Sequence, residues 1–135
     1  MRRLHLVVGL AAVLAFVITG QMMHFHQPKL VATPDDVHLM FLSRHVYLAG
    51  AALVNVCLGL YLRVQNTPWR RSLQIIGSTA VLLSPVFLLL AFLHEPAFGI
   101  AGRSWRSQLG VIPLVIGVAL HFVASQGAKS QPEAN

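Results

Sequence analysis

Four long apolar segments alternate with short polar stretches along the chain. The apolar runs cover residues 4–25, 39–62 and 73–93, and a shorter run covers about 108–124. A helix needs about 20 mainly apolar residues to cross the hydrocarbon core of a bilayer. In each run the apolar residues surround the helix instead of forming the single stripe of a soluble bundle. The pattern therefore predicts an all-α fold, an integral membrane bundle of four transmembrane helices.

Capping residues indicate where these helices start and stop. Thr33-Pro34 and Thr67-Pro68 each place a threonine at the N-cap and a proline at the first helical position. Glu95-Pro96 predicts a helix end, because the residue before a proline avoids helical geometry. We expect one domain over residues 1–135, with helices at about 4–25, 34–64, 68–95 and 106–124 and a flexible tail over 127–135.

Small and polar residues gather on one face of each predicted helix. In the second helix His38, His45, Ala52 and Gly59 recur every seven residues, with Asn55 beside them. Small residues let helix backbones approach, and an amide in lipid needs a partner on another helix. The other helices carry comparable stripes, at Gly9, Phe16 and Gly20, at Gln74, Gly77, Ser78, Val81, Ser84 and Leu88, and at Gly110, Pro113, Gly117 and His121. These faces predict a compact antiparallel bundle with short loops.

Composition supports a lipid environment. Hydrophobic residues make up 56% of the 135 residues and charged residues 10%, against about 25% charged in an average soluble domain. The net charge of +6 comes from scattered Lys and Arg without a basic face carrying aromatics, which argues against nucleic-acid binding. The excess of positive charge is better explained by attraction to anionic lipid headgroups and by the orientation of the chain in the membrane.

The distribution of Lys and Arg also predicts an orientation. A modest excess of basic residues on one side favours both termini in the cytoplasm of a multi-pass cell inner membrane protein. We expect the N-terminal segment to remain as an anchor, because no small-residue cleavage site precedes Gln21. The expected partners are the lipid bilayer and other membrane subunits.

This topology places most of the histidines at the outer ends of helices. The residues expected at the outer level are His24, His26, His38, His45 and His94, together with Met22, Met23, Asp35, Asp36 and Glu95. Only His5 and His121 fall toward the inner half. Several helix ends therefore bring imidazoles to one face of the membrane.

Three kinds of redox ligand suit such a cluster. Imidazoles from different helices can ligate haem b, with His45 as one axial ligand and His24 or His94 as the other. Thioethers and imidazoles at residues 22–26 favour copper. A quinone would use Arg44, His45 and Asn55 as polar contacts in an apolar cleft. The candidate cofactor-binding residues are His24, Arg44, His45, Asn55, His94 and Glu95, of which His24, His45 and His94 are the candidate metal ligands.

A structural interpretation stands beside each of these. Asp35 and Asp36 would stabilise the N-terminus of the second helix as capping residues. Arg44 would either extend to the lipid headgroups or pair with Glu95. His121 would pack or form a hydrogen bond inside the bundle. The sequence shows no nucleophile paired with a general base, so no catalytic residue is predicted. The sequence therefore favours a protein that is not an enzyme. The alternative function is a non-catalytic membrane subunit, assembly factor or scaffold whose histidines are interfacial.

Overall fold

The computed structural model describes residues 1–25, 35–95 and 105–126, and these residues form four helices. The helices are α1 (Arg2–Phe25), α2 (Asp35–Tyr61), α3 (Pro68–His94) and α4 (Trp105–Gln126). Each is long and apolar enough to cross a membrane, and the described residues include no strand. The predicted all-α class with four candidate spans is confirmed. The predicted cap at Thr33-Pro34 and the predicted tail over 127–135 lie outside the described residues.

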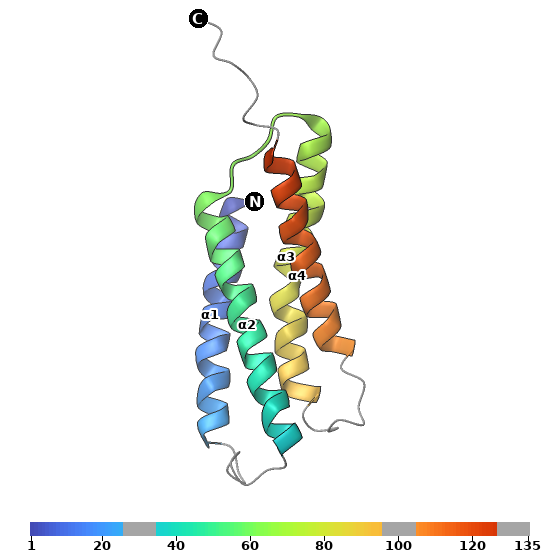
Figure 1. Cartoon of the computed structure of the whole chain (residues 1–135). Helices are drawn as coiled ribbons and strands as arrows, with labels where there is room; N and C mark the ends of the chain where they lie inside the picture. The colour runs from blue at the N-terminus through green and yellow to red at the C-terminus, as the bar shows by residue number, and fades with distance from the viewer. Residues whose placement is uncertain (26–34, 96–104, 127–135) are drawn as a thin grey trace, which may run out of the picture.

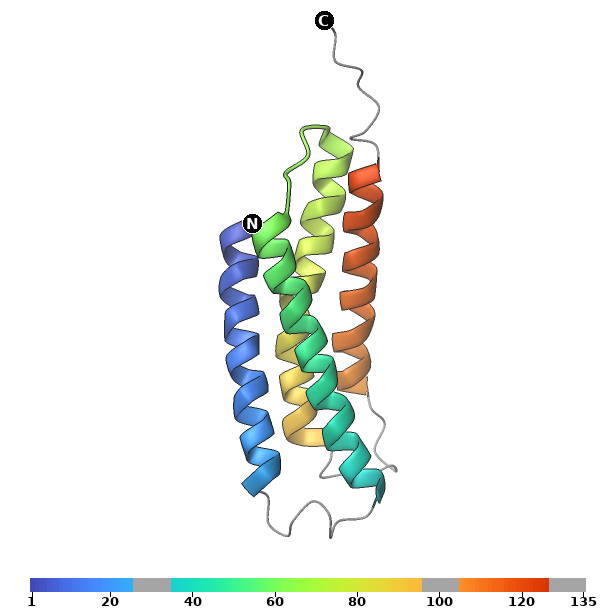
Figure 2. The same cartoon turned by 60° about the vertical axis from the view of Figure 1, so that its left-hand side comes forward.

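The four helices form an antiparallel bundle (Figure 1). α1 packs mainly along α2, and α3 mainly along α4, so the bundle consists of two helical hairpins. The start of α1, the end of α2, the start of α3 and the end of α4 lie together at one end, as the second view also shows (Figure 2). We call this the proximal end and the opposite one the distal end. The proximal end corresponds to the predicted inner side.

Glycines allow close contact within each hairpin. A Cβ at Gly59 would lie 2.7 Å from the backbone nitrogen of Leu6, and a Cβ at Gly117 would lie 2.7 Å from the carbonyl oxygen of Gly77. A side chain at either position would have to push two helix backbones apart. The predicted small-residue faces thus lie where helices touch.

The interior of the bundle is mixed polar and apolar, whereas its outside is apolar. The whole predicted stripe of α3 is buried, namely Gln74, Gly77, Ser78, Val81, Ser84 and Leu88. Leu48, Ala51 and Leu88 form an apolar cluster in the middle. Large apolar side chains on all four helices are exposed, as expected for a surface that faces lipid.

The turn between α2 and α3 is held by the buried side chain of Gln74. Its amide nitrogen donates to the carbonyl of Arg63 (2.8 Å), and its oxygen accepts from the backbone N–H of Gln65 (3.0 Å). This turn begins after Tyr61, earlier than the predicted end near residue 64. α3 then starts as predicted, with Thr67 at the N-cap and Pro68 in the first turn, although the threonine hydroxyl makes no cap hydrogen bond.

Candidate functional site

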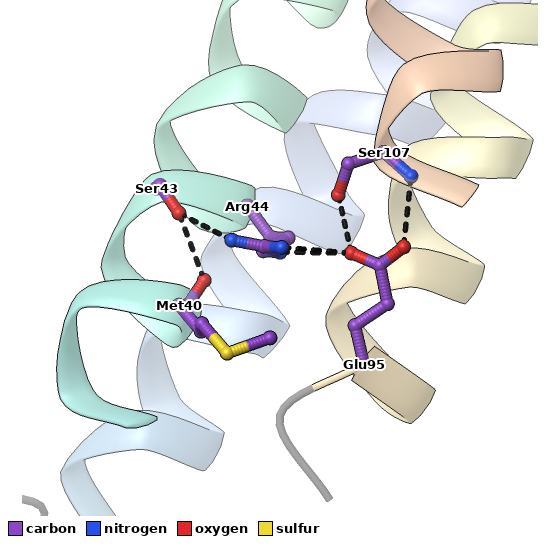
Figure 3. A network of polar contacts seen from close by, with 5 residues as sticks. All are labelled: Met40, Ser43, Arg44, Glu95 and Ser107. Atoms are coloured by element: carbon purple, nitrogen blue, oxygen red, sulfur yellow. Dashed lines mark hydrogen bonds and ion pairs between the residues drawn. The ribbon is translucent and has the colours of Figure 1, made fainter. Parts of the chain in front are cut away.

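At the distal end of the bundle, Arg44 of α2 forms an ion pair with Glu95 at the end of α3 (Figure 3). Arg44 Nε and Nη2 both lie near Glu95 Oε2, at 3.0 Å and 2.9 Å. Arg44 Nη1 also donates to Ser43 Oγ, which donates to the carbonyl of Met40. Both charged groups are buried. Of the two alternatives for Arg44, the structure shows the pair with Glu95.

The Glu95 carboxylate also binds the start of α4. The backbone N–H of Ser107 donates to Oε1 (3.0 Å), and the Ser107 hydroxyl donates to Oε2. The positive end of the α4 helix dipole also stabilises a carboxylate in this position. Burial by itself raises the pKa of the Glu95 carboxyl, but the hydrogen bonds from Ser107 and Arg44 and the Arg44 charge outweigh it. The pKa is therefore held below its ordinary value, and Glu95 stays ionised while it joins three helices.

His45 packs between α1 and α2 instead of joining this ion pair. Its ring stacks on Phe16 with 4.1 Å between ring centroids, and its Nδ1 lies 3.0 Å from the Thr19 hydroxyl oxygen. That hydroxyl donates to the Phe16 carbonyl, so it accepts from His45, whose Nδ1 carries the proton. The Cε1–Nε2 edge faces Gly20, where an added Cβ would be 3.3 Å from Cε1. His45 therefore joins two helices through polar and aromatic contacts.

The other predicted site residues are dispersed. His24 and His94 are exposed at the ends of α1 and α3, and His26 lies outside the described residues. Asn55 is ten residues beyond His45 on α2, about 15 Å along the helix axis. Within the described ranges no group of three or more His, Cys, Asp or Glu could hold a metal ion. Ligand binding by the distal histidines stays a prediction.

A second polar cluster, at the proximal half, begins with His5 of α1 and Asn55 of α2. Both side chains are fully buried, and His5 Nδ1 lies 2.9 Å from Asn55 Oδ1. The Asn55 amide nitrogen donates to the carbonyls of Ala51 (2.9 Å) and Val81 (3.1 Å), which fixes the orientation of the amide. Because Oδ1 only accepts, His5 Nδ1 carries the proton and Nε2 presents a lone pair.

The other hairpin supplies His121 of α4 and Ser78 of α3. His121 Nε2 lies 3.2 Å from the Ser78 hydroxyl, and its Cδ2 is the ring atom nearest to a Cβ placed on Gly77. This edge of the ring therefore faces α3, and Nδ1 lies on the opposite edge. His121 is only 8% exposed, and its ring centroid is 6.2 Å from that of His5. We call His5, Asn55, Ser78 and His121 the proximal cluster.

Two ring nitrogens of the proximal cluster are buried without a hydrogen bond. They are His5 Nε2 and His121 Nδ1, which have no partner within the part of the chain that the structure describes. A buried polar atom left unpaired costs about 1–3 kcal/mol. Each of the two rings is already fixed through its other nitrogen. Because the two ring centroids are 6.2 Å apart, there is room between the rings for one small group at most.

A lateral groove reaches the proximal cluster. It lies between α2 and α4, has a volume of about 630 Å³ and is lined mostly by apolar side chains. His121 forms part of its wall, together with Cys57 and Gln74, whereas His5 does not line it. His121 thus connects the groove to the interior of the bundle.

Sequence reasoning gave His121 a structural role and did not single out His5. The sequence carries no clear signal for this cluster, because the helices are staggered along the bundle: His5 lies three residues from the start of α1, whereas Ser78 lies ten residues from the start of α3. Comparison of the chain with protein-family models, with curated proteins and with solved structures gives no match.

Proposed function

We propose that this chain is a multi-pass membrane protein that holds a Cu(I) ion between His5 and His121. The observation that carries the proposal is the pair of unpartnered ring nitrogens on two buried imidazoles from different hairpins. An ion ligated by both would satisfy both lone pairs. It would also join the α1–α2 hairpin to the α3–α4 hairpin.

The spacing of the rings supports a single ion. Imidazole nitrogens bind such ions at about 2 Å, so two rings that ligate one ion in line have centroids about 6 Å apart. The observed separation is 6.2 Å, with the ring planes at 74° in an edge-to-face arrangement. The distance matches a single ion, and ligation by both rings requires one of them to turn so that its free nitrogen faces the other. Cu(I) accepts linear coordination by a pair of nitrogens, whereas Zn(II) prefers a tetrahedral set of ligands. Imidazole suits copper well, so Cu(I) is the ion that fits a site with only two protein ligands.

The contacts behind the two rings also favour a metal. A histidine that ligates a metal usually hydrogen-bonds through its other nitrogen, which fixes the tautomer and the ring orientation. His5 does so with Asn55 and His121 with Ser78. For His121, binding through Nδ1 requires that Nε2 carry the proton and donate to the Ser78 hydroxyl.

Haem b and quinone fit the proximal cluster less well. A haem would need its macrocycle between the rings, but His5 is fully enclosed by helices. A quinone in the α2–α4 groove would meet His121 and leave His5 Nε2 unpaired, because His5 is not part of the groove wall. A single ion satisfies both nitrogens, and the same groove gives it a path to His121.

Copper content tests the proposal. The protein is purified in detergent under reducing conditions, loaded with Cu(I), desalted against a weak chelator and analysed for metal. We expect about one copper per chain in the wild type and a loss of most of it in His5→Gln and in His121→Gln. A His24→Gln/His94→Gln variant changes two exposed histidines and should keep its copper. Circular dichroism verifies that each variant is helical. A wild type without copper, or glutamine variants that retain it, would refute the proposal.

A further inference from the structure

Charge is distributed unevenly between the two ends of the bundle. Within the described ranges the acidic side chains all lie at the distal end, at Asp35, Asp36 and Glu95. Among the described residues, the charged side chains of the proximal end are all arginines, namely Arg2, Arg3, Arg63, Arg70 and Arg71. A surface of one sign next to a membrane attracts headgroups of the opposite sign.

Two of these arginines border a depression in the surface. It has a volume of about 300 Å³ and is lined by Arg2, Arg3, Leu6 and Gly59. The close contact of Gly59 with the Leu6 backbone brings α1 against α2 at this point. The backbones of the two helices therefore meet at the depression, between Leu6 and Gly59.

Arg2 is held in place at the rim. Its Nη2 donates to the carbonyl of Leu60 at the end of α2 (2.9 Å), which uses one of the five N–H donors of a guanidinium. The planar donors that remain match the oxygens of a phosphate. Large apolar side chains further along α1 and α2, such as Val7, Leu10 and Leu53, are exposed, so apolar surface extends along both helices toward the middle of the bundle.

We infer that this depression binds the phosphodiester headgroup of an acidic phospholipid, with Arg2 and Arg3 on the phosphate and the acyl chains along α1 and α2. The observations combine a cationic depression, an arginine positioned by the neighbouring helix and an adjoining apolar face. The inference is independent of copper binding, because none of the four lining residues belongs to the proximal cluster.

Native mass spectrometry of the full chain tests this site. The protein is released from nanodiscs that contain phosphatidylglycerol and phosphatidylcholine in equal amounts, and the bound lipids are counted. We expect phosphatidylglycerol to be enriched on the wild type, and about tenfold weaker retention in Arg2→Gln/Arg3→Gln. Arg63→Gln/Arg71→Gln removes the same charge from exposed positions at the same end and should retain the lipid.

Two results would overturn the inference. Equal retention of the two lipids by the wild type would exclude a headgroup site. An equal loss in both double variants would mean that diffuse attraction, and not the depression, holds the lipid. Copper content measured on the same samples separates this outcome from a failure of the proposed function.

Discussion

Arg44 and Glu95 meet across the distal end of the bundle, where Nε and Nη2 of the arginine both contact the same carboxylate oxygen, at 3.0 Å and 2.9 Å. The two residues are 51 positions apart in the sequence, and Ser107 adds α4 to their contact. Of the residues predicted for a distal ligand site, Arg44 and Glu95 therefore hold α2, α3 and α4 together.

Removing one partner of this pair should be strongly destabilising. Glu95→Ala leaves the Arg44 charge buried without its carboxylate, and breaking a buried pair in this way costs about 3–5 kcal/mol. Reversible unfolding by denaturing detergent measures the change. Asp35→Ala, at an exposed position, is the control and should change the unfolding free energy by less than about 1 kcal/mol. Similar values for the two variants would show that the ion pair contributes little.

Stability should also fall in acid because of Glu95. Its folded-state pKa lies below the ordinary value of 4.5, so its contribution is complete above pH 4.5 and is lost as the pH falls through the folded-state pKa. We expect that, in the wild type, the detergent concentration at the midpoint of unfolding falls as the pH drops below 4.5. The decline should be smaller in Glu95→Gln, and identical pH profiles would contradict this assignment.

The close approach of α1 and α2 predicts a difference between two glycines of α2. A Cβ at Gly59 would lie 2.7 Å from the Leu6 backbone nitrogen, whereas a Cβ at Gly50 meets nothing within 4 Å. Gly59→Ala should lower the unfolding free energy by about 1–3 kcal/mol, as overpacking does. Gly50→Ala should be neutral or slightly stabilising, because alanine favours a helix over glycine. Equal effects would mean that the helices do not touch at Gly59.

A fourth prediction concerns the contacts by which His45 links α1 and α2. His45→Phe keeps an aromatic ring on Phe16 but removes the hydrogen bond to Thr19, so we expect a loss of about 1 kcal/mol in stability. We also expect no Soret or alpha band in a reduced-minus-oxidised spectrum of protein expressed with ample haem. Such bands, lost in His45→Phe, would instead identify His45 as a haem ligand.

Much of the fold follows from apolar run lengths and capping residues, because both depend on local sequence. The inward stripe of α3 was predicted for the same reason, since helical periodicity fixes which residues share a face. The pairing of side chains depends on the axial alignment of helices from distant segments. His45 and Asn55 share a helix face but lie about 15 Å apart along it, so they contact different residues of α1, Thr19 and His5. That alignment was not available from the sequence.

The first coordination shell of bound copper tests the central claim most directly. X-ray absorption at the copper edge of the Cu(I)-loaded protein reports the type, number and distance of the ligands. We predict two imidazole nitrogens at about 2 Å in linear geometry, and a changed spectrum in His121→Gln. A shell dominated by sulfur, or one unaffected when either His5 or His121 is replaced, would contradict a copper ion held between these two residues.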